Sequence, residues 1–154
     1  MHHHGGGYTD IKMTKTDWSP YFDSMDSTGY WANGYTEIPG GSASSNSNIT
    51  QNYKQLIGNC SYIFRPGTLL TASWIDALHK KLDQKLQQVI ENPPQGARDC
   101  TGSTEYSSTP STYPFRWAEL LGEHFHDIMY PYQDRILHEL PKSTQPITYS
   151  ILYI

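Results

Sequence analysis

Charged side chains are scarce in this chain of 154 residues. Asp, Glu, Lys and Arg together make up 17% of the sequence, and the formal net charge is −4. A surface that binds nucleic acid needs clustered Lys and Arg, whereas Lys80-Lys81 is the only adjacent basic pair. We therefore expect no nucleic-acid partner.

Long apolar runs and cysteines are also few. No apolar stretch approaches the roughly 20 residues of a membrane-spanning helix, so we expect no membrane partner. Cys60 and Cys100 are the only cysteines and lack CxxC spacing. This pattern favours two free, partly buried thiols, with a disulfide as the alternative.

Catalytic and metal-binding motifs are missing. The chain has no G-x-S-x-G, no Walker loop and no G-x-G-x-x-G. His138-Glu139 begins like a zinc-binding HExxH motif, but Lys142 stands where the second His belongs. His124 and His126 are two residues apart, so on a helix they point in different directions. His2 to His4 can bind a transition metal or form a flexible end. We predict that the protein is not an enzyme and has no catalytic residue, metal site or cofactor.

The most regular segment runs from Arg65 to Asn92. Pro66-Gly67 favours a turn, Thr71 is placed to cap a helix, and Pro93 stops it. An apolar stripe at steps of three or four residues predicts an amphipathic helix. The stripe packs either on the core of the same chain or, as a short coiled coil, on copies of the chain, although Lys85 interrupts the strictest heptad. It consists of Trp74, Ile75, Leu78, Leu82, Leu86, Val89 and Ile90.

The run from Gly67 to His79, GTLLTASWIDALH, resembles a pattern common in bacteriophage tail-fibre and tail-appendage proteins. In that pattern a Gly-Thr pair leads into Thr-Ala, a Trp and a polar helix. Asp76 stands where Asn is usual, and His79 where Gln is usual. The resemblance implies a structural protein of the virion that attaches or trimerises a fibre. Its partners would be copies of itself, such as a trimer, and other virion proteins.

We predict a single domain of α+β class over residues 1–154. Its two main amphipathic helices lie at about 71–91 and 115–129, with short strands and long irregular loops around them. The chain divides into a loop-rich N-terminal arm (1–48), a short strand with the capped helix (49–92), a long linker (93–114), and a helix with a C-terminal strand (115–154).

The second helix is predicted from an apolar stripe that includes His124 and follows Pro114. A strand is expected over Cys60 to Phe64, a short helix over 133–140 and a strand over 147–154. Asn33-Gly34 is read as a tight turn. The residues expected to form the core or a subunit interface are Trp74, Ile75, Leu78, Leu82, Leu86, Val89, Trp117, Leu120, Leu121 and Phe125.

The aromatic residues suggest a second function. Trp18 and Trp31 lie in aromatic patches between turn residues, where their rings can stack on sugars. The alternative is that they anchor the core or an interface, where Trp is also enriched. A carbohydrate-binding or adhesive module is therefore the alternative to a virion structural protein of the tail, baseplate or fibre-attachment region.

Overall fold

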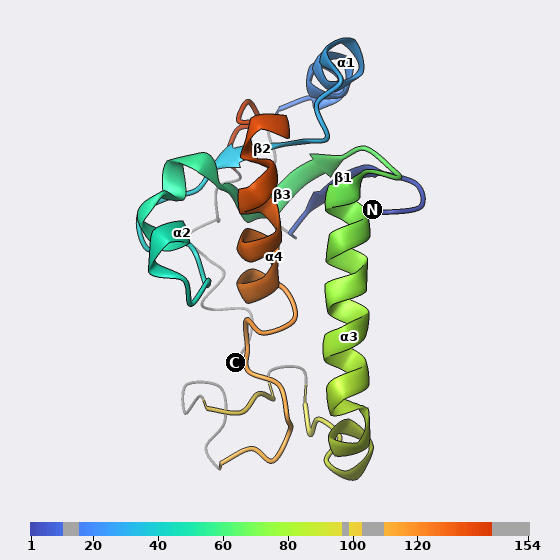
Figure 1. Ribbon diagram of the computed structural model, residues 1–154, viewed down its shortest axis with the longest axis vertical. Coiled ribbons are helices and arrows are strands. Elements are labelled where there is room, and N and C mark those ends of the chain that lie inside the picture. Colours follow the sequence, from blue (N-terminus) through green and yellow to red (C-terminus); the bar gives the residue numbers. More distant parts are fainter. Residues whose placement is uncertain (11–15, 97–98, 103–109, 143–154) are drawn as a thin grey trace.

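A computed structural model describes residues 1–10, 16–96, 99–102 and 110–142, which form helices around a small mixed sheet (Figure 1). This confirms the predicted α+β class. The helices are α1 (Ser19–Thr28), α2 (Ser47–Gln51), α3 (Leu69–Glu91) and α4 (Gly122–Met129), with 3-10 turns η1 (Tyr53–Gln55) and η2 (Tyr130–Arg135). The strands are β1 (Gly6–Thr9), β2 (Ala32–Thr36), β3 (Ile57–Phe64) and β4 (Ile136–Leu137).

Strand β3 lies at the centre of the sheet, whose strand order among the described residues is β1-β3-β2-β4. It pairs antiparallel with β1 and β2, so that Phe64 lies opposite Gly6 on one side and Ala32 on the other. Strand β4 pairs with β2 in parallel. The strand predicted over Cys60 to Phe64 is confirmed and begins earlier, at Ile57.

The two faces of β3 contribute to two apolar clusters, because successive side chains of a strand point to opposite faces. Tyr62 and Phe64 belong to the main cluster, which α3 and α4 cover. Ile63 belongs to a smaller cluster with Met25 of α1 and Leu140. Helix α3 runs well past the N-terminal end of α4, so its C-terminal half stands away from the sheet (Figure 1).

The loop-rich N-terminal arm expected over 1–48 also contains regular structure, namely β1, α1 and β2. The tight turn predicted at Asn33-Gly34 is wrong, since both residues are buried within β2. A Cβ atom at Gly34 would lie 2.7 Å from the Cβ of Ile57. The glycine therefore permits close packing of β2 on β3.

Gly34→Ala is expected to lower the free energy of unfolding by about 1–3 kcal/mol, the usual range for an overpacked core. The added methyl group meets Ile57 where neither strand can move away without losing ladder hydrogen bonds. Urea unfolding measures the change. Gly96→Ala is the control, because nothing lies within 4 Å of its added Cβ. Equal stability of the two variants would contradict this account of Gly34.

The helix predicted at 115–129 begins only at Gly122. Leu121 has φ −121° and ψ −76°, outside the helical region, and the residues before it form turns. The Arg116 amide donates to Glu119 Oε2 at 3.0 Å, which holds the turn. Within α4, His126 is buried with Phe125 and Met129, while His124, expected on the apolar stripe, is only half-buried.

The short helix predicted over 133–140 is wrong in its second half, where the chain forms β4 and then runs along β2. The buried side chain of Asn33 donates to Glu139 Oε2 and accepts from the Glu139 amide, each at 3.1 Å. These bonds favour the extended form.

The described part of the linker 93–114 has neither helix nor strand. The strand predicted over 147–154 lies outside the described residues.

Candidate functional site on helix α3

Helix α3 begins at Leu69, and its N-cap lies three residues earlier than predicted. Gly67, with φ +68°, forms the turn that leads into it. Thr68 rather than Thr71 is the N-cap, and its Oγ1 accepts a hydrogen bond from the Thr71 amide at 3.2 Å. The earlier start buries Leu70 completely in the main cluster.

The N-terminal half of α3 is part of the core. The ring of Trp74 lies 5.8 Å from that of Tyr62, 5.6 Å from Phe64 and 5.3 Å from Phe125, measured between centroids. Leu78 packs at the edge of this cluster. Edge-to-face and tilted arrangements at these distances are favourable between aromatic rings, so this group anchors α3 to β3 and α4.

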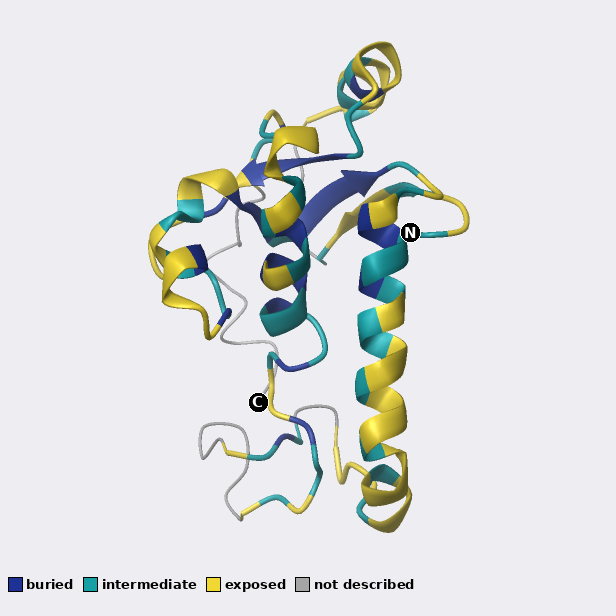
Figure 2. Cartoon of the chain, in the orientation of Figure 1, coloured by how far each residue is buried: buried dark blue, intermediate teal, exposed yellow. Residues whose placement is uncertain are grey.

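The C-terminal half of α3 exposes its apolar residues to solvent (Figure 2). Leu82 is 44% exposed, Leu86 is 55% and Ile90 is 65%. Ile75 and Val89 are half-buried. These five residues are called the apolar face of α3 below. The predicted stripe is therefore divided between core and surface.

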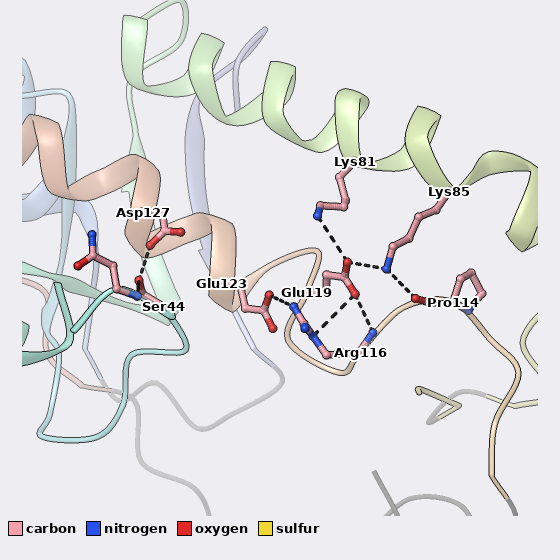
Figure 3. A network of polar contacts seen from close by, with 9 residues as sticks. Ser44, Lys81, Lys85, Pro114, Arg116, Glu119, Glu123 and Asp127 are labelled. Atoms are coloured by element: carbon pink, nitrogen blue, oxygen red, sulfur yellow. Dashed lines mark hydrogen bonds and ion pairs between the residues drawn. The ribbon is translucent and has the colours of Figure 1, made fainter. Parts of the chain in front are cut away.

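The side of α3 that faces the protein carries lysines. Lys85 Nζ lies 2.6 Å from Glu119 Oε1 and donates to the carbonyl of Pro114 at 2.7 Å. Lys81 Nζ lies 3.6 Å from the same carboxylate oxygen. Arg116 joins Glu119 to Glu123 in the same network (Figure 3).

Glu119 is the centre of this network, and its side chain is only 4% exposed. Burial by itself would raise the pKa of this carboxyl. The hydrogen bonds from Lys85 and from the Arg116 amide outweigh burial, and the net shift of the Glu119 pKa is downward. Glu119 is therefore ionised at neutral pH and holds the 114–119 turn against α3.

The network gives Lys85 a structural role that its place in the sequence does not indicate. In sequence this lysine interrupts a heptad, but in the structure it points toward its own chain and away from the apolar face. The C-terminal half of α3 is thus inverted relative to an ordinary surface helix, whose apolar side faces the core. Contiguous exposed apolar patches are typical of contact surfaces, which makes this face the candidate site.

Of the remaining residues predicted for core or interface, the described structure places Phe125 in the main cluster and Leu121 at its edge. Leu120 is half-buried. Trp117 is 59% exposed, because it lies in the turns before α4 and not on that helix.

A buried polar pair links Glu37, the residue after β2, to His126 of α4. His126 is fully buried, and its Nε2 lies 3.1 Å from the carbonyl of Ile57 and 3.5 Å from Glu37 Oε2. Burial lowers the pKa of His126, although the Glu37 carboxylate opposes this effect. Ser44 donates to Asp127 beside the pair. Because His126 is sealed from solvent, the pair acts as a structural link.

The free energy of unfolding is expected to fall as the pH drops below about 6.5, the ordinary pKa of His. In this range His126 and His138 bind protons in the unfolded chain. In the folded chain burial lowers the pKa of both side chains, so they stay neutral. Each contributes at most about 1.4 kcal/mol per pH unit, until its native pKa is reached. Denaturant unfolding at several pH values measures the slope. His126→Gln should flatten this slope, and an unchanged slope in His126→Gln would contradict the assignment.

The two tryptophans predicted to contact glycans are both half-buried and packed. Trp18 lies against the cluster of Met25, Ile63 and Leu140. Trp31 lies against the main cluster, with Arg135 5.7 Å from its ring. A hollow of about 330 Å³ lies elsewhere, and its lining includes Tyr113, Phe115, Trp117, Asp99 and Arg116.

Metal and membrane sites have no support in the described ranges. No three His, Cys, Asp or Glu residues there are placed to share a metal ion, and no helix there could span a membrane. His2 Nδ1 lies 3.1 Å from Thr71 Oγ1, and Cys60 and Cys100 are free thiols.

Comparisons of the chain with protein-family models, curated proteins and solved structures find no match.

Proposed function

We propose that this chain is a structural protein of a phage virion, in the tail, baseplate or fibre-attachment region, and that it acts through contacts between subunits. The observation that carries the proposal is the exposed apolar face of α3. The resemblance of Gly67 to His79 to phage tail-fibre and tail-appendage proteins supports the virion setting.

The apolar face is suited to a modest contact that is repeated many times. Full burial of a Leu or Ile side chain contributes roughly 1.5–3 kcal/mol. Since Leu82, Leu86 and Ile90 are 44%, 55% and 65% exposed, covering them adds about half to two-thirds of that per residue. One such contact is weak, but several in one particle reinforce each other, because later contacts form at high effective concentration.

Analytical ultracentrifugation over a range of protein concentrations tests the subunit contacts. The average mass is expected to rise from that of the monomer to that of a small oligomer. A monomer at every accessible concentration, including millimolar, would overturn the proposal. The genes beside the coding sequence test the virion setting independently: tail, baseplate or capsid genes would support it, and a purely metabolic neighbourhood would contradict it.

A carbohydrate-binding module is the second candidate function, and the hollow beside Tyr113 and Trp117 favours it. Aromatic rings can stack on the apolar faces of sugars, while Asp99 and Arg116 can hydrogen-bond their hydroxyls. Binding on a glycan array that is lost in Trp117→Ala and retained in Trp18→Ala would favour this function. An array without binding would dismiss it.

A further inference from the structure

We propose that α3 pairs with α3 of a second copy of this chain, parallel and in register, along a seam on its exposed side. The seam is defined as Ile75, His79, Leu82, Leu86 and Val89. This inference rests on the proposed function and names the partner of the apolar face.

The spacing of the seam is that of a coiled coil. Its residues are separated by steps of four, three, four and three, the pattern of alternating d and a positions. His79 and Leu86 occupy a positions, and Ile75, Leu82 and Val89 occupy d positions. His79 is exposed as well, so the pattern continues across it. A single polar residue at an a position is a common way to specify register.

The seam is accessible to a partner because the groups that face the protein lie on another side of α3. At 100° per residue, the centre of the seam lies about 100° around the helix axis from Lys81 and Lys85. Both lysines are held by Glu119 of the same chain. A second helix can therefore approach the seam without breaking the network.

The charges beside the seam select the parallel arrangement. Asp76 and Asp83 lie at e positions on one flank of the seam. In an antiparallel pair e positions face e positions, so these carboxylates would lie near Asp76 or Asp83 of the partner subunit. In a parallel pair e faces g, so Asp83 faces the partner's Leu78, and no like charges meet.

Single cysteines at the seam test this arrangement in the full chain. His79→Cys and Leu86→Cys are each made in a background with Cys60→Ser and Cys100→Ser, and oxidised dimers are read on non-reducing gels. A disulfide requires Cα atoms within about 7 Å. A parallel pair in register brings each new cysteine to its own copy, so both variants should form covalent dimers. Gln87→Cys, one residue away and off the seam, should not.

Other outcomes would overturn the parallel seam. Covalent dimers only in a mixture of His79→Cys and Leu86→Cys would show an antiparallel pair. A disulfide within one chain that carries Leu86→Cys and Ile151→Cys would show that the chain's own C-terminal segment covers the face. Circular dichroism of each variant confirms folding, and His79→Cys alone carries the test if Leu86→Cys fails to fold.

Ultracentrifugation and cysteine cross-linking together distinguish an error in the proposed seam from an error in the proposed function. If the protein oligomerises in the ultracentrifuge but neither seam cysteine forms a dimer, the seam is wrong while subunit contacts remain. If the protein stays monomeric and neither variant cross-links, both are wrong.

Discussion

A chain with Leu82→Asp and Leu86→Asp is expected to fold normally and to lose its association with other copies. Both side chains are about half exposed, so in the monomer the new carboxylates reach water. In the paired helices each would be buried without a partner, at about 2 kcal/mol or more. Since 1.4 kcal/mol is a factor of ten, association should weaken at least about 100-fold. Sedimentation equilibrium measures association, and thermal unfolding measures stability.

The matched control is Gln84→Asp with Gln87→Asp. It adds the same two charges to the same turns of α3, at exposed positions outside the apolar face. This control should associate like the natural chain. Equal weakening in both double variants would mean that charge, and not the apolar face, governs association.

Trp74→Ala is expected to lower the free energy of unfolding by about 3–5 kcal/mol, the usual range for removing a large buried aromatic side chain. Trp74 is only 8% exposed and contacts the rings of Tyr62, Phe64 and Phe125. Its loss leaves a cavity where α3, α4 and β3 meet. Urea unfolding, followed by circular dichroism, measures the change.

Trp117→Ala is the control for Trp74→Ala, because the same side chain is removed from a site that is 59% exposed. Its effect on stability should stay within about 1 kcal/mol. A loss equal to that of Trp74→Ala would mean that the turns before α4 contribute as much to the core as the aromatic cluster does.

The parts of the fold that the sequence predicts are those with strong local signals. Helix α3 has a turn, a capping threonine and a closing Asn-Pro-Pro, so it is recognised with an error of only about one turn at its start. Strand β3 has a short apolar run that ends at Pro66-Gly67. Each of these signals acts within a few residues and does not depend on the rest of the chain.

The parts that the sequence misses depend on distant residues. Strand β2 contains an Asn-Gly pair, a typical turn signal, yet it is held between β3 and β4 by pairing and by Gly34 against Ile57. The first half of the helix predicted at 115–129 becomes turns in which Glu119 meets Lys85 of α3. Local propensity cannot anticipate either contact.

Local sequence signals are enough to predict that an amphipathic helix follows Pro66-Gly67 and that its apolar residues form a stripe, because caps and helical periodicity are local properties. What each part of the stripe contacts depends on how the rest of the chain folds around it. Trp74 enters the core because Tyr62 and Phe64 of β3 and Phe125 of α4 pack around its ring. Leu82 and Leu86 remain exposed because Glu119 draws Lys81 and Lys85 inward and turns their side of α3 toward the protein.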